Sequence, residues 1–154
     1  MNVTEIVIGV AVVLLLLARQ VQKRSVKEDS RPVIFLVLAV VGLVEAGQFL
    51  KSHPVGSEAI LLTAASLVLA AVFGVIRAYT MRLWREEGQL FRQGNVLTIV
   101  LWLVAIGLHI GGDTLIDSSA KGLSTTTLLL YLAVSLGVQQ VVVRYRATQL
   151  SSQV

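Results

Sequence analysis

Five long apolar stretches, separated by short polar connections, make up most of this 154-residue chain. A helix needs about 20 mainly apolar residues to cross a hydrocarbon core about 30 Å thick, and each stretch is close to that length. The pattern therefore predicts an all-α polytopic membrane protein, a bundle of five transmembrane helices that forms a single domain over residues 1–154. The expected spans are approximately residues 3–21, 33–50, 58–79, 96–116 and 126–143.

Basic residues are concentrated on alternate connections between the apolar stretches. Eleven of the 13 Lys and Arg residues lie after the first stretch, around the connection between the third and fourth, or in the tail. Only Lys51 and Lys121 lie on the other side. Loops with an excess of Lys and Arg remain in the cytoplasm, so we expect the N-terminus outside and the C-terminus inside the cell.

The overall composition agrees with a membrane protein. The chain is 55% apolar and 14% charged, whereas an average soluble domain is about 45–50% apolar and about 25% charged. The net charge of +4 does not indicate a nucleic-acid partner, because the basic residues flank the apolar stretches instead of forming a folded patch. Cysteine is absent, which excludes disulfides, thiol chemistry and thiolate metal sites.

The connection between the third and fourth stretches is the longest, and we expect it to form a short cytoplasmic hairpin around Gly88. A short amphipathic helix is the alternative, which Gly88 disfavours. Trp84 and Phe91 fall on the expected strands, where their amphipathic rings suit the membrane interface. Arg82, together with Arg77 at the end of the third stretch, is expected to anchor the protein at this interface or to bind a lipid phosphate.

Two helix faces are marked by residues that recur at every fourth position. This spacing places side chains on one face of a helix, and small residues there let a second helix pack closely. The third stretch has such a packing seam, formed by Ser66, Ala70 and Gly74. The fifth stretch has a polar face, formed by Tyr131, Ser135 and Gln139.

Ionisable residues inside a bilayer are costly, and each needs a partner or a wet cavity. Glu45 and His109 interrupt the second and fourth stretches at a similar depth in the outer half, and Asp113 follows His109 by one helical turn. Gln48 and Tyr131 reach the same level. These five residues predict an outer-facing polar pocket for a cation, a proton or a small polar ligand. A purely structural pairing of Glu45 with His109, or a metal or haem site at His109, are the alternatives.

The chain has no nucleophile elbow, no His-Glu-x-x-His motif and no glycine-rich phosphate loop. The sequence therefore favours a non-enzymatic protein, and it identifies neither a cofactor nor a metal site. The first hypothesis is a small accessory or interaction protein whose partners are the lipid bilayer, a second copy of the chain or another membrane protein. A cation- or proton-coupled binding or transport protein that uses the outer pocket is the second. Haem or metal binding through His109 is a weaker third.

Three sets of residues resemble the CcdC-like family of small bacterial integral membrane proteins. They are Arg19-Gln20, the run Gly74-x-x-Arg77-x-x-Thr80-x-Arg82-x-Trp84 with Glu87-Gly88 and Arg92-Gln93-Gly94, and Trp102. The resemblance implies a multi-pass protein of the bacterial inner (cytoplasmic) membrane. The family is named for its association with cytochrome c maturation loci, and the resemblance assigns no activity. The chain departs from the family at His109, where an arginine is expected, and without cysteine it cannot exchange thiols directly.

Overall fold

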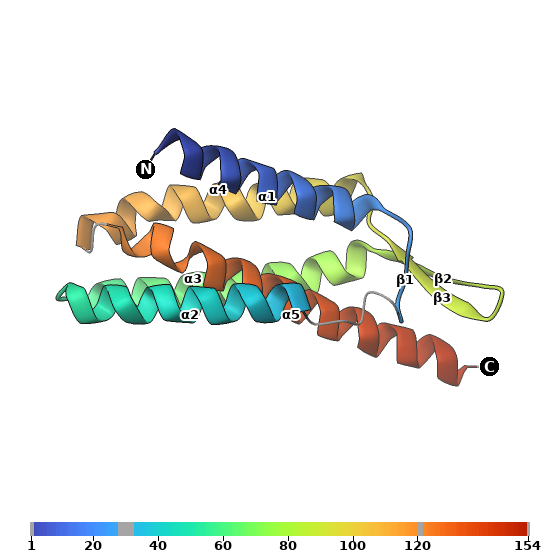
Figure 1. Cartoon of the computed structure of the whole chain (residues 1–154). Helices are drawn as coiled ribbons and strands as arrows, with labels where there is room; N and C mark the ends of the chain where they lie inside the picture. Colours follow the sequence, from blue (N-terminus) through green and yellow to red (C-terminus); the bar gives the residue numbers. More distant parts are fainter. Residues whose placement is uncertain (1, 28–32, 120–121, 154) are drawn as a thin grey trace.

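The computed structural model describes residues 2–27, 33–119 and 122–153. The described chain forms five helices and a small sheet at one end of the bundle, which we call the sheet end (Figure 1). The predicted five-helix architecture is therefore confirmed. The helices are α1 (Val3–Val21), α2 (Val33–Ser52), α3 (Ser57–Thr80), α4 (Val96–Ser119) and α5 (Leu123–Ser152), and the strands are β1 (Arg24–Ser25), β2 (Arg82–Glu86) and β3 (Gln89–Gln93).

Three of the described helices are long and apolar enough to span a membrane: α2, α3 and the part of α5 from Thr126 to Ser152. The apolar runs of α1 and α4, Ile6–Val21 and Val96–Gly112, are shorter. Large apolar side chains are exposed along the outside of the bundle, as at Leu61, which is 70% exposed. Soluble proteins rarely expose extensive apolar surface. The helix lengths and this surface indicate a membrane protein.

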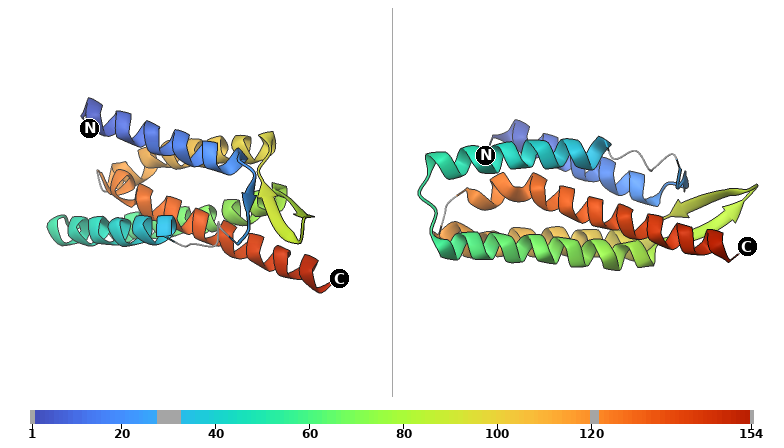
Figure 2. Two further views of the ribbon diagram at one scale, coloured as in Figure 1. Left: turned by 45° about the vertical axis from the view of Figure 1, so that its right-hand side comes forward. Right: turned by 90° about the horizontal axis from the view of Figure 1, so that it is seen from below.

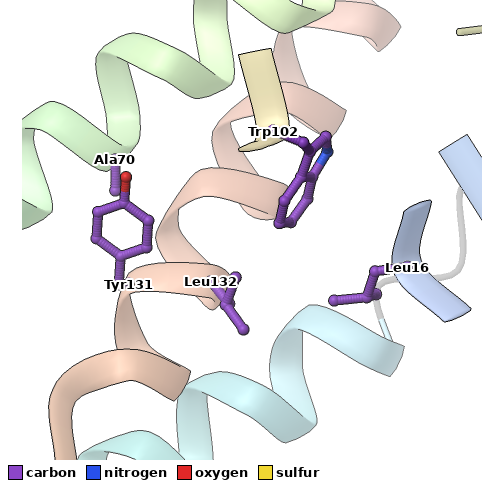
Figure 3. Packing of buried hydrophobic residues seen from close by; sticks show 5 residues of the cluster. All are labelled: Leu16, Ala70, Trp102, Tyr131 and Leu132. Atoms are coloured by element: carbon purple, nitrogen blue, oxygen red, sulfur yellow. The ribbon is translucent and has the colours of Figure 1, made fainter. Parts of the chain in front are cut away.

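Helix α5 is the centre of the bundle. Helices α2 and α3 pack along it, α4 packs against α3 and α5, and α1 packs against α4. The views in Figure 2 agree with Figure 1 in placing α5 between one layer of α1 and α2 and another of α3 and α4. The main core cluster joins α1, α3 and α4 to α5 (Figure 3), through Leu16, Ala70, Trp102, Tyr131 and Leu132.

Helix α5 continues past the predicted end of the fifth stretch at residue 143. The extension contains no glycine or proline that would stop a helix. Its Ala147 is buried, and its Arg146 donates hydrogen bonds to the backbone carbonyls of Ala78 and Met81 at the end of α3. The polar tail thus stays helical because it packs on α3 and satisfies carbonyls that the end of α3 leaves unpaired.

Close packing of α3 on α5 depends on Gly74. A Cβ atom at this position would lie 2.6 Å from the carbonyl oxygen of Ser135 and 3.2 Å from Cβ of Val138. Ala70 and Ala78, on the same face of α3, are completely buried. The face on which the small residues recur is therefore the one that α3 turns toward α5.

The predicted hairpin between α3 and α4 is confirmed. Strands β2 and β3 pair antiparallel with Trp84 opposite Phe91, and the two ring centroids are 6.0 Å apart. Glu87 and Gly88 both have positive φ angles, 49° and 78°. Two such residues form the tight turn that matches the twist of a hairpin.

Strand β1 also joins the sheet and ties the end of α1 to the hairpin. Arg24 of β1 lies opposite Arg92 of β3. The backbone N–H of Gly94 donates to the carbonyl of Gln20 at 2.8 Å, and a Cβ atom at Gly94 would lie 2.5 Å from that oxygen. Only glycine permits so close an approach. The sequence did not predict β1, because two residues are too few to show a strand periodicity.

Lys23, which precedes β1, holds this strand against the hairpin. Its Nζ forms an ion pair with Glu86 and lies over the rings of Phe91 and Trp84, 4.5 Å and 5.6 Å from their centroids. Hydrogen bonds from Lys23 and then Trp84 lower the pKa of the Glu86 carboxyl below its ordinary value of 4.5. The ionised carboxylate therefore stabilises the position of β1.

We expect Gly74→Ala to lower the thermal midpoint of the protein in detergent. Overpacking of a close helix contact costs about 1–3 kcal/mol, which exceeds the gain of about 1 kcal/mol in helix propensity. Gly107→Ala in α4 is the matched control, because a Cβ atom there meets nothing within 4 Å. A midpoint for Gly74→Ala equal to or above that of Gly107→Ala would contradict the packing described.

Attachment of β1 should weaken in acid. A carboxyl with a lowered pKa in the folded state contributes stability that is complete above its ordinary pKa and is lost as the pH falls through the lowered value. We expect the fluorescence of Trp84, measured in a Trp102→Phe background, to change with a midpoint below pH 4.5. The same titration of Glu86→Gln should be flat, and an unchanged titration in that variant would exclude Glu86 as the group responsible.

Candidate functional site: a basic cavity at the sheet end

Two residues of the predicted outer pocket, His109 and Tyr131, meet inside the bundle. Both are buried, and their ring centroids are 4.4 Å apart. His109 Nδ1 lies 3.2 Å from the hydroxyl of Ser66 on α3, and the Tyr131 hydroxyl donates to the carbonyl of Ala105 at 3.1 Å. The pair therefore joins α3, α4 and α5 through polar contacts within the core.

The other predicted members are not gathered around this pair. Glu45 and Gln48 are exposed on α2, which packs against α5. The side chain of Asp113 lies outside the described part of the structure. The described residues thus form a buried His109–Tyr131 contact and a separate polar surface on α2.

Arg77, which the sequence predicted as an anchor that reaches the membrane interface, is completely buried inside the bundle. Its guanidinium stacks on the ring of Trp102, 4.1 Å from the centroid, and Nη2 donates to the hydroxyl of Ser135. The reason is its position three residues after Gly74, which puts it on the face of α3 that is turned inward. Within the described chain, Nε and Nη1 of Arg77 have no hydrogen-bond partner.

The polar face predicted on the fifth stretch is the inner face of α5. Tyr131, Ser135 and Gln139 are all buried, and each contacts a different helix. The ring of Tyr131 packs against the tilted ring of His109 on α4, Ser135 accepts from Arg77 of α3, and Gln139 Nε2 donates to Gln20 Oε1 of α1 at 2.8 Å. This row of polar contacts ends at the sheet end of the bundle.

A cavity of about 610 Å³ lies at that end, between α1, the start of α2, α5 and the sheet. Four arginines line it, namely Arg19, Arg24, Arg92 and Arg144. The described part of the lining contains no Asp or Glu. Potential in a cleft lined by charges of one sign is strongly concentrated, so this cavity attracts anions.

Two of these arginines are held side by side by the sheet. Arg24 and Arg92 are direct partners in the β1–β3 ladder, so their side chains lie on the same face of the sheet. Nη2 of Arg24 donates to Oε1 of Gln22, and Nη1 of the buried Arg92 donates to Sδ of Met81, both at 3.2 Å. Nε of Arg24 has no hydrogen-bond partner among the described residues. An anion in the cavity would offer these side chains charge-assisted hydrogen bonds.

Three glutamines complete the polar lining: Gln20, Gln139 and Gln140. Gln139 is 3% exposed, and its Oε1 accepts no hydrogen bond from the described residues. A buried carbonyl oxygen without a donor costs free energy. The cavity therefore offers an acceptor for a hydroxyl or N–H group beside its cationic groups.

The remaining predicted residues lie on the hairpin. Trp84 and Phe91 are half-buried on neighbouring strands, where Lys23 covers their rings, and Arg82 is exposed. None of the three lines the basic cavity.

In the sequence, the cavity arginines indicate topology, and Arg19 and Arg92 also belong to the residues that resemble the CcdC-like family; nothing there points to a shared cavity. Gln20 and Gln139 were the available clue, because both are amides within apolar stretches and each therefore needs a partner. The convergence of α1, β3 and α5 could not be foreseen, because the sequence shows no sign of β1.

Among the described residues, no group of three His, Asp or Glu side chains could hold a metal ion. Comparisons of the chain with protein-family models, with curated proteins and with solved structures find no match.

The Arg77–Ser135 contact can be tested by a double-mutant cycle. Ser135→Ala leaves another buried donor of Arg77 unpaired, so it should lower the free energy of unfolding by about 1–3 kcal/mol. In an Arg77→Met background, where no charge remains, Ser135→Ala should cost much less. Thr148→Ala, on the exposed part of α5, is the control. Equal costs of Ser135→Ala in both backgrounds would show that the two side chains are not coupled.

Proposed function

We propose that the chain is a small non-enzymatic binding protein that holds an anionic ligand in the basic cavity at the sheet end. One observation carries the proposal. Arg24 and Arg92, which the sheet sets opposite each other, line a cavity with two further arginines and with no acidic residue among those described. The arginine side chains that line the cavity offer a bound anion charge-assisted hydrogen bonds.

The membrane topology in this proposal is five spans with the N-terminus outside and the C-terminus inside a bacterial cytoplasmic membrane. The excess of Lys and Arg near the sheet and in the tail supports it. The arrangement in Figure 1 is compatible, because the N-terminus lies at the end opposite the sheet and the C-terminus lies at the sheet end. The cavity would then face the cytoplasm or the inner leaflet.

The residues that resemble the CcdC-like family also support the basic cavity as the functional site. Several residues that carry it, Arg19, Gln20 and Arg92, line the cavity. Two others, Arg77 and Trp102, form the buried stack described above. We therefore propose that the chain acts as an accessory protein in the membrane and that it binds its ligand or partner at the sheet end.

Proton- or cation-coupled transport through an outer pocket is a weaker proposal. It needs Glu45 and His109 to act together, and the exposed position of Glu45 on α2 does not favour this. The buried contact between His109 and Tyr131 is explained by packing alone. The same applies to haem or metal binding at His109, which lacks further ligands among the described residues.

Inorganic pyrophosphate is a suitable probe of the proposed anion site. We expect it to raise the thermal midpoint of the detergent-purified full chain, with a rise that grows with the logarithm of its concentration above the dissociation constant. Arg24→Gln/Arg92→Gln should abolish the rise, because the variant lacks two of the four arginines that line the cavity. Arg85→Gln on β2, an exposed arginine outside the cavity, should respond as the wild type does.

The proposal fails if pyrophosphate stabilises the double variant as much as it stabilises the wild type and Arg85→Gln. It also fails if none of the three responds to pyrophosphate or to the anionic lipid used below.

A further inference from the structure

The basic cavity has an apolar side whose residues continue onto the outer surface of the helices. Leu16 of α1 and Leu136 of α5 line it from within the bundle, and Ile34 and Phe35 line it from the first turn of α2. Ile34 is 39% exposed, and its neighbour Val33, also in the lining, is 59% exposed. The cavity is therefore continuous with the apolar surface of α2.

The two sides of the lining come from different parts of the fold. Arg24 and Arg92 belong to the sheet, which lies beyond the helices, whereas Leu16, Ile34 and Leu136 belong to the helices themselves. A ligand that fills the cavity must therefore present an anionic group toward the sheet and an apolar group toward the helix surface. A free inorganic anion satisfies only the first requirement.

We propose that the ligand is an anionic phospholipid of the surrounding leaflet, with its phosphate between Arg24 and Arg92 and an acyl chain along Ile34 and the first turn of α2. The inference rests on the proposed function, because it names the class of ligand for the same cavity. The buried Oε1 of Gln139, which accepts no bond from the described residues, would take a hydroxyl of the headgroup. Phosphatidylglycerol combines these three features: a phosphodiester anion, acyl chains and free hydroxyls.

Native mass spectrometry of the detergent-purified full chain tests this inference with phosphatidylglycerol and phosphatidylcholine as probes. We expect phosphatidylglycerol to bind at least about tenfold more tightly, because arginines, one of them buried, contact a net negative headgroup. Arg24→Gln/Arg92→Gln should remove the preference, and Arg85→Gln should retain it. Ile34→Asn should weaken the binding of phosphatidylglycerol without changing the response to pyrophosphate. Leu36 is an exposed residue of α2 outside the lining, so Leu36→Asn should change neither.

The outcomes separate the two proposals. If pyrophosphate binding requires Arg24 and Arg92 but phosphatidylglycerol is not preferred, the lipid inference is overturned and the anion site stands. The inference would also be overturned if Ile34→Asn and Leu36→Asn weakened the binding of phosphatidylglycerol equally, because α2 would then make no specific contact with an acyl chain. If neither probe depends on Arg24 and Arg92, both proposals are wrong.

Discussion

The structure depends on how the buried polar face of α5 is satisfied inside an apolar bundle. A polar group without a partner is costly there, because neither lipid nor a packed core replaces the hydrogen bonds of water. The hydroxyls of Tyr131 and Ser135 and the amide N–H of Gln139 find partners on α4, α3 and α1 in turn, and only Oε1 of Gln139 accepts no bond from the described residues. Apolar contacts between helices are non-directional, so these three polar contacts are the ones that specify which helix lies on which side of α5.

The same constraint explains why two sets of arginines have opposite surroundings. Arg77 is closed in by Trp102 and Ser135, where aromatic stacking offsets part of the cost of burying a guanidinium. Arg24 and Arg92 instead line the cavity at the sheet end. The first arrangement fixes the helices, so we regard Arg77 as a structural residue, and the second forms the anion site that we propose.

The helices and the hairpin were predictable because their signals are local. Apolar length predicted five helices, and Gly88 with its flanking aromatic residues predicted the turn and strands. Arg77 was misplaced because an arginine near a helix end resembles an interface anchor, although its spacing from Gly74 already put it on the inward face. The basic cavity was missed because it needs β1, which follows from the contact of Gly94 with Gln20 and not from any periodicity.

We infer that Arg24 and Arg92 lie at the centre of an anion site. An experimental density map of the full chain in nanodiscs that contain phosphatidylglycerol tests this inference most directly. We expect non-protein density beside the two arginine side chains that extends toward Ile34 on α2. A cavity filled only by solvent, or one in which acidic side chains of the chain itself neutralise both arginines, would contradict it.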